Sequence, residues 1–391
     1  MLVVSCNGWV PVTDNPNCYL IIKPGIKPQL LYFKAMDYWH EMPKDPSGFW
    51  VDQFDIKMIA SFDEMKNELP KNLSNTAYIG AYGNQFSEFG FKSVNPEVLM
   101  NEFHWLRGSK SEYEQHCMKE ASLLGAKAHT AAKHAFYDGK SEYEIHLTYM
   151  NAIGFMEYQL PYGNIIALNE HASTLHYTKV EHERKSDLFS FLIDAGAEVN
   201  GYASDITRTY SYKKDEFQDM IDALDAEQLK LIDQLKVGEG YPETHLRSHF
   251  AIARILSDFK FVNLKAEDIV EKRISSTFYP HGIGHLLGLQ VHDIGGFMEG
   301  PHGGFIQRPD GHPFLRLTRK IEENFVFTIE PGLYFIGMLL DELKKSDNSK
   351  YVNWEKVGKF MKYGGIRIED NVLVKQSGTE NFTRWAFKTV N

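Results

Sequence analysis

Two aspartates, Asp194 and Asp205, stand on either side of an Asn200-Gly201 pair, and the hairpin that this pattern predicts constrains the fold more than any other feature of the chain. Asn-Gly between two strand-like runs favours a two-residue type I′ turn, because both central residues of that turn need a positive φ. In such a hairpin Asp194 lies opposite Thr207, which shares a face with Asp205. The two aspartates are then diagonal neighbours, roughly 7–8 Å apart at the backbone.

The inner face of an apolar hairpin is an unfavourable place for two acids. A bulge would shift the register by one residue and separate them, whereas a regular ladder keeps both on the same side. Two carboxylates held there repel each other and lose hydration, unless a positive group lies between them. The hairpin therefore predicts a metal site.

Three later segments carry further acids and imidazoles at the ends of predicted strands, or on one face of them, beside glycines that permit tight turns. They span residues 281–293, 325–332 and 364–370. Alternation in the last segment puts Arg367 and Glu369 on one face. A single acid at a strand end is often a solvated turn residue, so the prediction of a site depends on the ordered set.

Charge balance indicates how many cations the site holds. The candidate ligands are four carboxylates and one imidazole, namely Asp194, Asp205, His285, Glu330 and Glu369. Two divalent cations balance four carboxylates, whereas one would leave a surplus of buried negative charge. A carboxylate-rich set without thiolate favours Mn²⁺, with Co²⁺ or Zn²⁺ as alternatives. We therefore expect two divalent ions per chain, which can hold a shared hydroxide as a nucleophile.

Composition excludes several classes of partner. The chain has 391 residues, enough for two domains, and a net charge of −10, which argues against nucleic acid. No apolar run approaches the length that spans a membrane. Three cysteines without a CxxC pair suit a reducing compartment. We expect a cytoplasmic protein with no nucleic-acid or membrane partner.

The chain divides at a polar break around residue 108. Residues 1–108 show strand-like runs at 19–22, 30–33, 56–59 and 77–79, which predict a small α/β domain. In residues 109–391, capping boxes at Ser111 and Ser141 begin helices that end near Tyr137 and Ile153, and further helices are expected over 215–236 and 242–259. Together with the hairpin, this order favours an α+β domain with a mainly antiparallel sheet and flanking helices.

Other catalytic motifs are missing from the sequence. The glycines at 282, 284 and 288 do not have the spacing of a dinucleotide fingerprint, and no strand-turn-helix context surrounds them. The chain has no GxSxG elbow, P-loop or HExxH motif. Nucleophilic serine or cysteine catalysis therefore has no local support.

The ordered motifs resemble those of the pita-bread metallopeptidases, and within them the bacterial Xaa-Pro dipeptidases (prolidases), close to the branch that includes organophosphorus acid anhydrolase. The likeness covers nearly the whole chain and is carried by residues 191–196, 204–209, 280–285, 291–293, 329–332 and 368–370. It implies a pita-bread catalytic domain behind a creatinase-N-like domain. The relatives it resembles begin with a further segment, so the first domain is expected to be truncated and its sheet incomplete.

The resemblance also implies a role for each site residue. Asp194 would chelate one metal ion, Asp205 and Glu369 would bridge both, and His285 and Glu330 would bind the other. Glu330 would also be the general base, with His292 at the scissile carbonyl and His281 beside it as catalytic residues. The implied substrate-binding residues are His176, Arg316, Arg367, Tyr241, Tyr162, Leu175, Val291 and Leu315.

Some of these assignments have simpler alternatives. Tyr162 and Tyr241 could be plain packing residues, and His176 and His281 could act only through hydrogen bonds to other site residues. Arg316 suits a terminal carboxylate because its planar fork can bind both oxygens. His302 and His312 lie in a Gly/Pro-rich loop and receive no role.

The expected function is hydrolysis of Xaa-Pro dipeptides by a dinuclear-metal enzyme that acts as a homodimer, with dimer closure in doubt because of the short first domain. One alternative is an organophosphate triester hydrolase, since a hydroxide between two metals can also attack phosphorus. An aminopeptidase for longer chains is disfavoured by Arg316. A pita-bread scaffold used only for binding is disfavoured by the complete ligand set.

Overall fold

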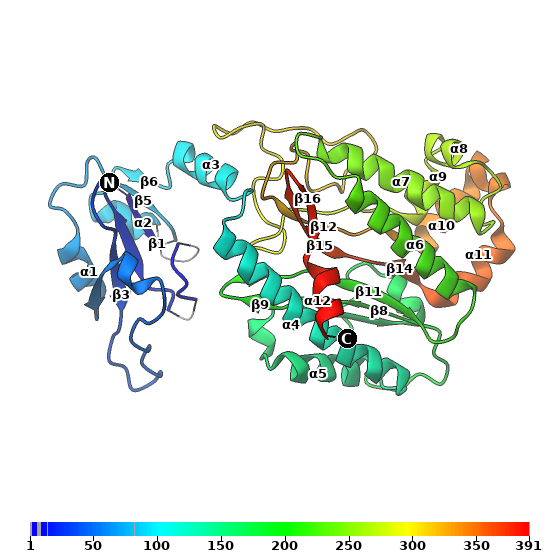
Figure 1. Ribbon diagram of the computed structural model, residues 1–391, viewed down its shortest axis with the longest axis horizontal. Helices are drawn as coiled ribbons and strands as arrows, with labels where there is room; N and C mark the ends of the chain where they lie inside the picture. The colour runs from blue at the N-terminus through cyan, green and yellow to red at the C-terminus, as the bar shows by residue number, and fades with distance from the viewer. Residues whose placement is uncertain (1, 6–8, 14, 82, 391) are drawn as a thin grey trace. The chain divides into compact units, whose positions relative to one another are not determined.

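The computed structural model describes residues 2–5, 9–13, 15–81 and 83–390. The chain forms two compact units, residues 1–106 with 300–303, and residues 107–299 with 304–391. Each unit contains strands and helices of its own (Figure 1). Of the three cysteines, Cys18 and Cys117 are buried, and Cys6 lies outside the described residues.

The first unit is built on a six-stranded sheet in the order β4-β3-β2-β1-β5-β6. The pairs β1–β2 and β2–β3 are antiparallel, and the other three pairs are parallel. Alternate residues of its strands enter two cores, Val3 and Tyr19 on one face and Val4 and Leu20 on the other. The four expected strand runs are confirmed among β1 (Leu2–Ser5), β2 (Tyr19–Ile22), β3 (Gln29–Phe33), β4 (Asp55–Ile59), β5 (Ala77–Ile79) and β6 (Ser93–Val94), which accompany α1 (Phe62–Glu68), α2 (Gly83–Glu88) and α3 (Glu97–Leu106).

Local capping determines where the long helices of the second unit begin. The hydroxyls of Ser111 and Ser141 each accept a hydrogen bond from the backbone N–H of a glutamate three residues later. The carboxylate of that glutamate in turn accepts a hydrogen bond from the backbone N–H of the serine. Asp215 caps a third helix. The expected helices are therefore confirmed as α4 (Glu112–Tyr137), α5 (Glu142–Ile153), α6 (Glu216–Asp233) and α7 (Tyr241–Asp258), and shorter ones follow as α8 (Ala266–Glu271), α9 (Ile274–Phe278), α10 (Gly337–Lys345), α11 (Trp354–Phe360) and α12 (Phe382–Val390).

The strands of the second unit pair antiparallel, which confirms the expected α+β class. They form the sheets β11-β8-β7, β10-β9, β12-β15-β16 and β13-β14. The strands are β7 (Ile165–Leu168), β8 (Ser190–Asp194), β9 (Glu198–Val199), β10 (Tyr202–Ala203), β11 (Thr207–Ser211), β12 (Val326–Ile329), β13 (Gly332–Tyr334), β14 (Gly365–Arg367), β15 (Asp370–Lys375) and β16 (Gly378–Asn381).

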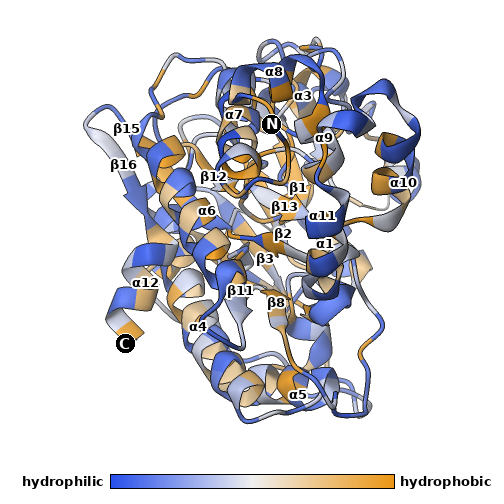
Figure 2. Ribbon diagram, turned by 90° about the vertical axis from the view of Figure 1, so that its right-hand side faces the viewer, coloured by the Kyte–Doolittle hydropathy of each residue, from blue (hydrophilic) through white to orange (hydrophobic). Residues whose placement is uncertain are grey.

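Helices cover these sheets through separate apolar clusters. Phe136 of α4 and Ile145 of α5 pack against Phe191 and Ile193 of β8. Another cluster joins α6 and α7 to β13 and β14. The ribbon of α4 alternates between hydrophilic and hydrophobic segments, as expected for a helix with one face on the core (Figure 2).

The hairpin has the geometry that its sequence predicts. Asn200 and Gly201 have φ angles of +53° and +84°, as a type I′ turn requires. Thr207 pairs with Asp194, and Tyr202 pairs with Val199 in the same register. No bulge shifts the ladder between these two paired stretches, so both aspartates keep the predicted face.

The apolar run 286–291 before His292 does not form a strand, and within it only Leu286 makes a bridge, to Phe327. Gly284 has a φ of +158° and Gly288 bonds to the carbonyl of Gln290 at 3.1 Å, so the chain turns instead of extending.

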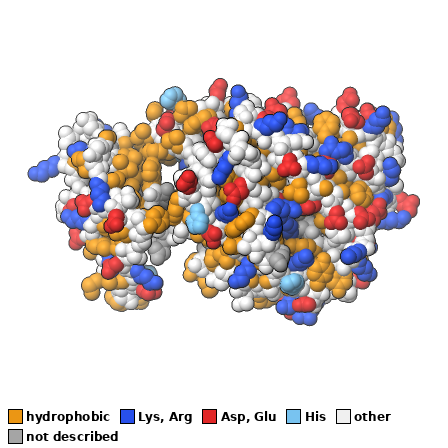
Figure 3. Space-filling model, in the orientation of Figure 1, with side chains coloured by type: hydrophobic (Ala, Val, Ile, Leu, Met, Phe, Trp, Pro, Cys, Tyr) orange, Lys and Arg blue, Asp and Glu red, His pale blue; other side chains and the backbone are white. Residues whose placement is uncertain are grey.

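The surface on the face shown in Figure 3 carries acidic and basic side chains interspersed, without one dominant sign. Among the described helices, none has both the length and the apolar character needed to cross a bilayer.

A buried ion-pair network fixes the strand end beside Glu369. Asp370 is fully buried and pairs with Arg208 Nη2 at 2.7 Å and with Arg384 Nε at 2.6 Å. Arg208 also donates to the carbonyls of Thr207 and Glu369, both at 2.8 Å. Burial opposes ionisation of Asp370, but the two arginines outweigh it and lower its pKa to about 2.

Replacing Asp370 with asparagine should destabilise the metal-free protein by about 3–5 kcal/mol, because two arginines lose a buried partner. The folded pKa lies below the unfolded value of about 3.9, so this contribution is complete above that pH and is lost as the pH falls toward 2. Urea unfolding at several pH values measures the difference from wild type. A difference that does not change down to pH 2 would contradict the assignment.

Candidate metal centre

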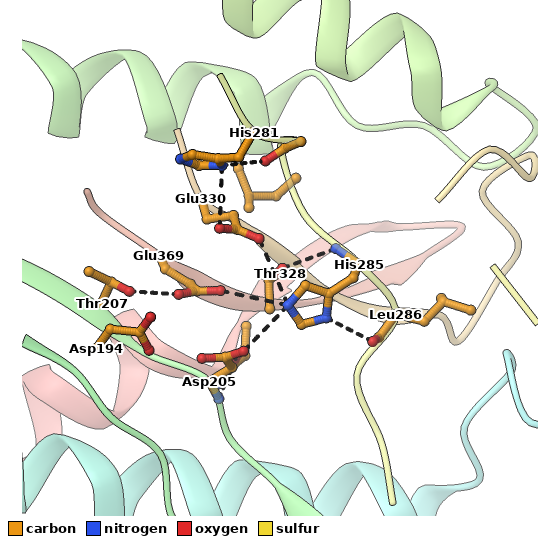
Figure 4. A network of polar contacts seen from close by, with 12 residues as sticks. Asp194, Asp205, Thr207, His281, His285, Leu286, Thr328, Glu330 and Glu369 are labelled. Carbon is orange, nitrogen blue, oxygen red and sulfur yellow. Dashed lines mark hydrogen bonds and ion pairs between the residues drawn. The ribbon is translucent and has the colours of Figure 1, made fainter. Parts of the chain in front are cut away.

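The five predicted metal ligands line one cavity of about 280 Å³ in the second unit. They come from the hairpin, the loop before β12, the turn after β12 and the segment between β14 and β15. Figure 4 shows their side chains directed toward one another. The cavity is lined by Leu175, His176, Asp194, Asp205, Pro280, His281, Gly282, Gly284, His285, His292, Phe314, Arg316, Glu330, Arg367 and Glu369.

His285 is the centre of this cluster. Its Nε2 lies 3.3 Å from Asp205 Oδ2, 3.8 Å from Glu330 Oε1 and 4.0 Å from Glu369 Oε1. The other ring nitrogen contacts the carbonyl of Leu286 at 3.0 Å, which orients the ring and leaves Nε2 for the acids. One oxygen each of Asp205 and Glu369 and one nitrogen of His285 lie within 4.8 Å of one another.

Tyr162 connects the two hairpin aspartates. Its hydroxyl lies 2.9 Å from Asp194 Oδ1 and 2.6 Å from Asp205 Oδ1. One hydroxyl can reach both carboxylates only if they share a face, as the register predicts. Because the hydroxyl carries one proton, it donates to one carboxylate at a time. Burial and the two acids raise the pKa of Tyr162 well above its usual value, so it remains a donor.

Arg367 forms an ion pair with one acid of the cluster. Its Nη2 pairs with Asp194 Oδ2 at 2.6 Å, and its Nη1 donates to the Tyr334 hydroxyl oxygen at 3.0 Å. Thr207 stands between Arg367 and Glu369, with its hydroxyl donating to Glu369 Oε2 at 2.7 Å. Arg367 therefore holds Asp194 in place and supplies part of the positive charge that the acids need.

Burial and mutual repulsion make the charged form of most of these carboxylates unfavourable. Burial raises the pKa of Asp194, and it raises that of Glu330 to about 7. The pKa of Glu369 rises well above its usual value through burial and the nearby Asp205 and Glu330. Asp205 is the exception, because contact with His285 outweighs its burial and lowers its pKa. Protons therefore occupy part of the cluster when no cation balances it.

The donor set fits two divalent cations. The four carboxylates have one paired arginine, Arg367 on Asp194, and contacts with the imidazoles of His285 and His281. These groups carry less positive charge than the four carboxylates carry negative charge. Their carboxylate oxygens and one imidazole are ligands that Mn²⁺, Co²⁺ and Zn²⁺ accept. Tyr162 and Thr207 donate to Asp205 Oδ1 and Glu369 Oε2, whereas Asp205 Oδ2 and Glu369 Oε1 face His285 Nε2.

The other predicted site residues divide into two groups. His176, His281, His292, Arg316 and Leu175 line the same cavity. Tyr162 and Val291 line an adjoining cavity of about 510 Å³ that shares His176, His292 and both hairpin aspartates.

Tyr241 and Leu315 do not line the ligand cavity, although the resemblance implied that both bind the substrate. Tyr241 is fully buried, and its hydroxyl donates to the carbonyl of Thr328 at 2.9 Å. Leu315 is buried in the same apolar cluster as Tyr241. Both therefore support the wall from behind, because apolar packing and a backbone acceptor satisfy them there.

Sequence reasoning missed two residues of the site. Phe314 lines the cavity with 64% of its surface exposed, next to Arg316. Tyr334 contacts His281 Nε2 at 2.8 Å and Arg367 Nη1 at 3.0 Å. Phe314 had a signal in its place beside Arg316, whereas nothing in the sequence around Tyr334 indicates that it lies between two site residues.

Comparison with known families agrees with this geometry. The profile of metallopeptidase family M24 matches residues 116–376, and that of the Xaa-Pro dipeptidase N-terminal domain matches residues 3–105. The chain therefore belongs to metallopeptidase family M24, which confirms the expected family and enzyme class. The boundary predicted at residue 108 lies between the two matches and stays a prediction.

Within that family the chain is similar to Xaa-Pro dipeptidases. It is 47% identical over 377 residues to the one from Shewanella denitrificans and 48% identical over 378 residues to the one from Pseudoalteromonas translucida. Each match covers 96% of this chain and 86% of the relative.

Solved structures confirm the fold. Aminopeptidase P from Escherichia coli in a low-pH form has a TM-score of 0.69 at 22% identity, covering 95% of this chain and 84% of that chain. Proline aminopeptidase P II from Yersinia pestis has a TM-score of 0.68 at 22% identity, covering 94% and 83%.

Replacing Tyr162 with phenylalanine should weaken metal binding by about 10- to 100-fold, because the two aspartates lose the hydroxyl that orients them. Calorimetric titration of the metal-free protein with Mn²⁺ measures the change. Tyr158→Phe is the matched control, since Tyr158 is 83% exposed. Equal affinities in the two variants would show that the contact has no part in holding the ligands.

Proposed function

We propose that this chain hydrolyses Xaa-Pro dipeptides at the cavity that holds the acid cluster. The observation that carries the proposal is the joint presence of all five ligand residues in one cavity and 47–48% identity to Xaa-Pro dipeptidases over nearly the whole chain. A cavity of about 280 Å³ is small for a ligand site, which suits a dipeptide better than a long chain.

Asp194, Asp205, His285, Glu330 and Glu369 would hold two divalent ions, with Mn²⁺ as the metal we expect first. When bound, such ions polarise a carbonyl and make water a stronger nucleophile. Glu330 lies among the ligands, 3.8 Å from His285 Nε2, and would take a proton from water and return it to the leaving nitrogen. His281 stays fixed by Gly282 and Tyr334, each contacting one ring nitrogen at 2.8 Å.

Arg316 and His292 would bind the substrate. Arg316 is exposed and lines the cavity, where its planar fork can receive the terminal carboxylate of a dipeptide. His292 packs edge-on against His285, with ring centroids 4.3 Å apart, and so lies beside the position of the scissile carbonyl. His176 and Leu175 would form the opposite wall, and Tyr241 and Leu315 would support it.

We also infer a cytoplasmic homodimer, which sedimentation and fractionation can test.

The purified protein, incubated with Mn²⁺, should hydrolyse Xaa-Pro dipeptides, and Asp205→Asn should abolish the activity because a bridging ligand is lost. Free proline released from a panel of dipeptides is the readout, with tripeptides and an organophosphate triester assayed beside it. No hydrolysis of any Xaa-Pro dipeptide, together with an unchanged metal content in Asp205→Asn, would overturn the proposal. Faster triester than dipeptide turnover would favour the organophosphate alternative.

Arg316→Gln should lower kcat/KM for a dipeptide by about 10- to 100-fold, mainly through KM, because a charge-assisted contact to the carboxylate is lost. Dipeptide amides, which lack that carboxylate, should be hydrolysed equally well by the variant and the wild type. Lys320→Gln changes an exposed cation nearby and serves as the control. Equal losses for acids and amides would contradict carboxylate recognition.

A further inference from the structure

A second group of potential metal ligands lies outside the acid cluster. His245 and His249 stand one turn apart on α7, and His312 approaches them from the loop at 311–315. The ring centroids of the three histidines are 4.8, 4.6 and 4.7 Å apart in pairs. Three imidazoles at nearly equal spacing form a symmetrical cluster, although none of them belongs to the site described above.

Two ring nitrogens of this cluster, His245 Nδ1 and His249 Nε2, are buried without a hydrogen-bond partner. His245 Nε2 and His312 Nδ1 face each other at 2.9 Å. His249 Nδ1 contacts Ser275 Oγ at 3.1 Å, while its Nε2 is buried without a hydrogen-bond partner. His245 and His249 are only 1% and 2% exposed, so the unpartnered nitrogen is a cost to the fold unless something binds it.

The protonation state of the rings suits ligation. Burial lowers the pKa of His249 to about 3, and it also lowers that of His245 and, less strongly, that of His312. The rings are therefore neutral at physiological pH and carry the lone pairs that a metal needs.

The spacing matches three imidazoles around one ion. With a metal–nitrogen distance of about 2.0–2.1 Å and tetrahedral angles, ring centroids would be about 5 Å apart. We propose that His245, His249 and His312 bind one further transition-metal ion, Zn²⁺ in the first instance, separate from the dinuclear cluster. The contact of Ser275 with His249 would orient the ring, as a partner of a metal-bound imidazole commonly does.

The ligand chemistry separates the two sites. A set made only of imidazole suits Zn²⁺, Ni²⁺ or Cu²⁺, whereas the carboxylate-rich cluster suits Mn²⁺. A cavity of about 220 Å³ adjoins the three rings and leaves room for a solvent ligand in the fourth position. No carboxylate is among the residues that line this cavity, so the ion would retain its charge and favour an anionic fourth ligand.

The site would also affect the substrate pocket. Phe314 lines both this cavity and the acid-lined cavity, and Arg316 follows two residues later. An ion held by His312 and by two residues of α7 would tie this loop to the helix. The loop that carries the proposed carboxylate-binding arginine would then be held in one position.

Elemental analysis of the desalted protein tests the proposal. The Mn²⁺-loaded full-length chain is incubated with Zn²⁺, and total bound metal is compared between wild type and His312→Ala. The wild type should retain about one equivalent more per chain than the variant. His249→Gln should show the same loss, and His302→Ala, which changes an exposed histidine ten residues before His312 in the sequence, should show none.

X-ray absorption at the zinc edge gives a second readout in an Asp205→Asn, Glu369→Gln background, where the acid cluster is disabled. Zinc bound to three imidazoles supports the proposal, and its disappearance in His312→Ala confirms the ligands. Equal metal content in wild type and His312→Ala, with both folded by circular dichroism, would overturn it. Loss of dipeptidase activity alone would bear on the dinuclear site and leave this difference unchanged.

Discussion

The mutual repulsion of four carboxylates, two of them buried and two partly buried, is the interaction on which the rest of the catalytic unit depends. Asp194, Asp205, Glu330 and Glu369 line one cavity, and the burial that raises three of their pKa values makes the cluster unfavourable without positive charge. Arg367 satisfies one of them. Asp205, Glu330 and Glu369 have no such arginine partner. Several elements end at this cavity, each with an acid at its end, and a bound cation would hold these acids together.

The scaffold holds these acids through partners that lie outside the cavity. Arg208 and Asp370 join the backbone at Thr207 to that at Glu369, so the hairpin and the last ligand are fixed relative to each other. Thr207 then contacts the carboxylate of Glu369. Because the ligand positions depend on these partners, metal affinity and the stability of the unit are properties of one network.

The sequence predicted what is decided locally. The register of the hairpin follows from the positive φ angles of Asn200 and Gly201, and the long helices begin at capping residues that act within one turn. The apolar run 286–291 does not extend as a strand, because the chain turns at Gly288, whose N–H bonds to the carbonyl of Gln290. Tyr334 was missed because its two contacts come from segments 53 and 33 residues away, and no local pattern reports such an encounter.

The histidine cluster likewise depends on a contact between residues that are distant in sequence. His245 and His249 had a local signal in their helical spacing, but His312 lies 67 and 63 residues from them in sequence, in a loop to which the sequence assigned no role. Only the packing of that loop on α7 turns a histidine pair into a three-imidazole set. Since imidazole and carboxylate differ in the ions they prefer, the three-imidazole set would favour Zn²⁺ over Mn²⁺ more strongly than the carboxylate-rich cluster does.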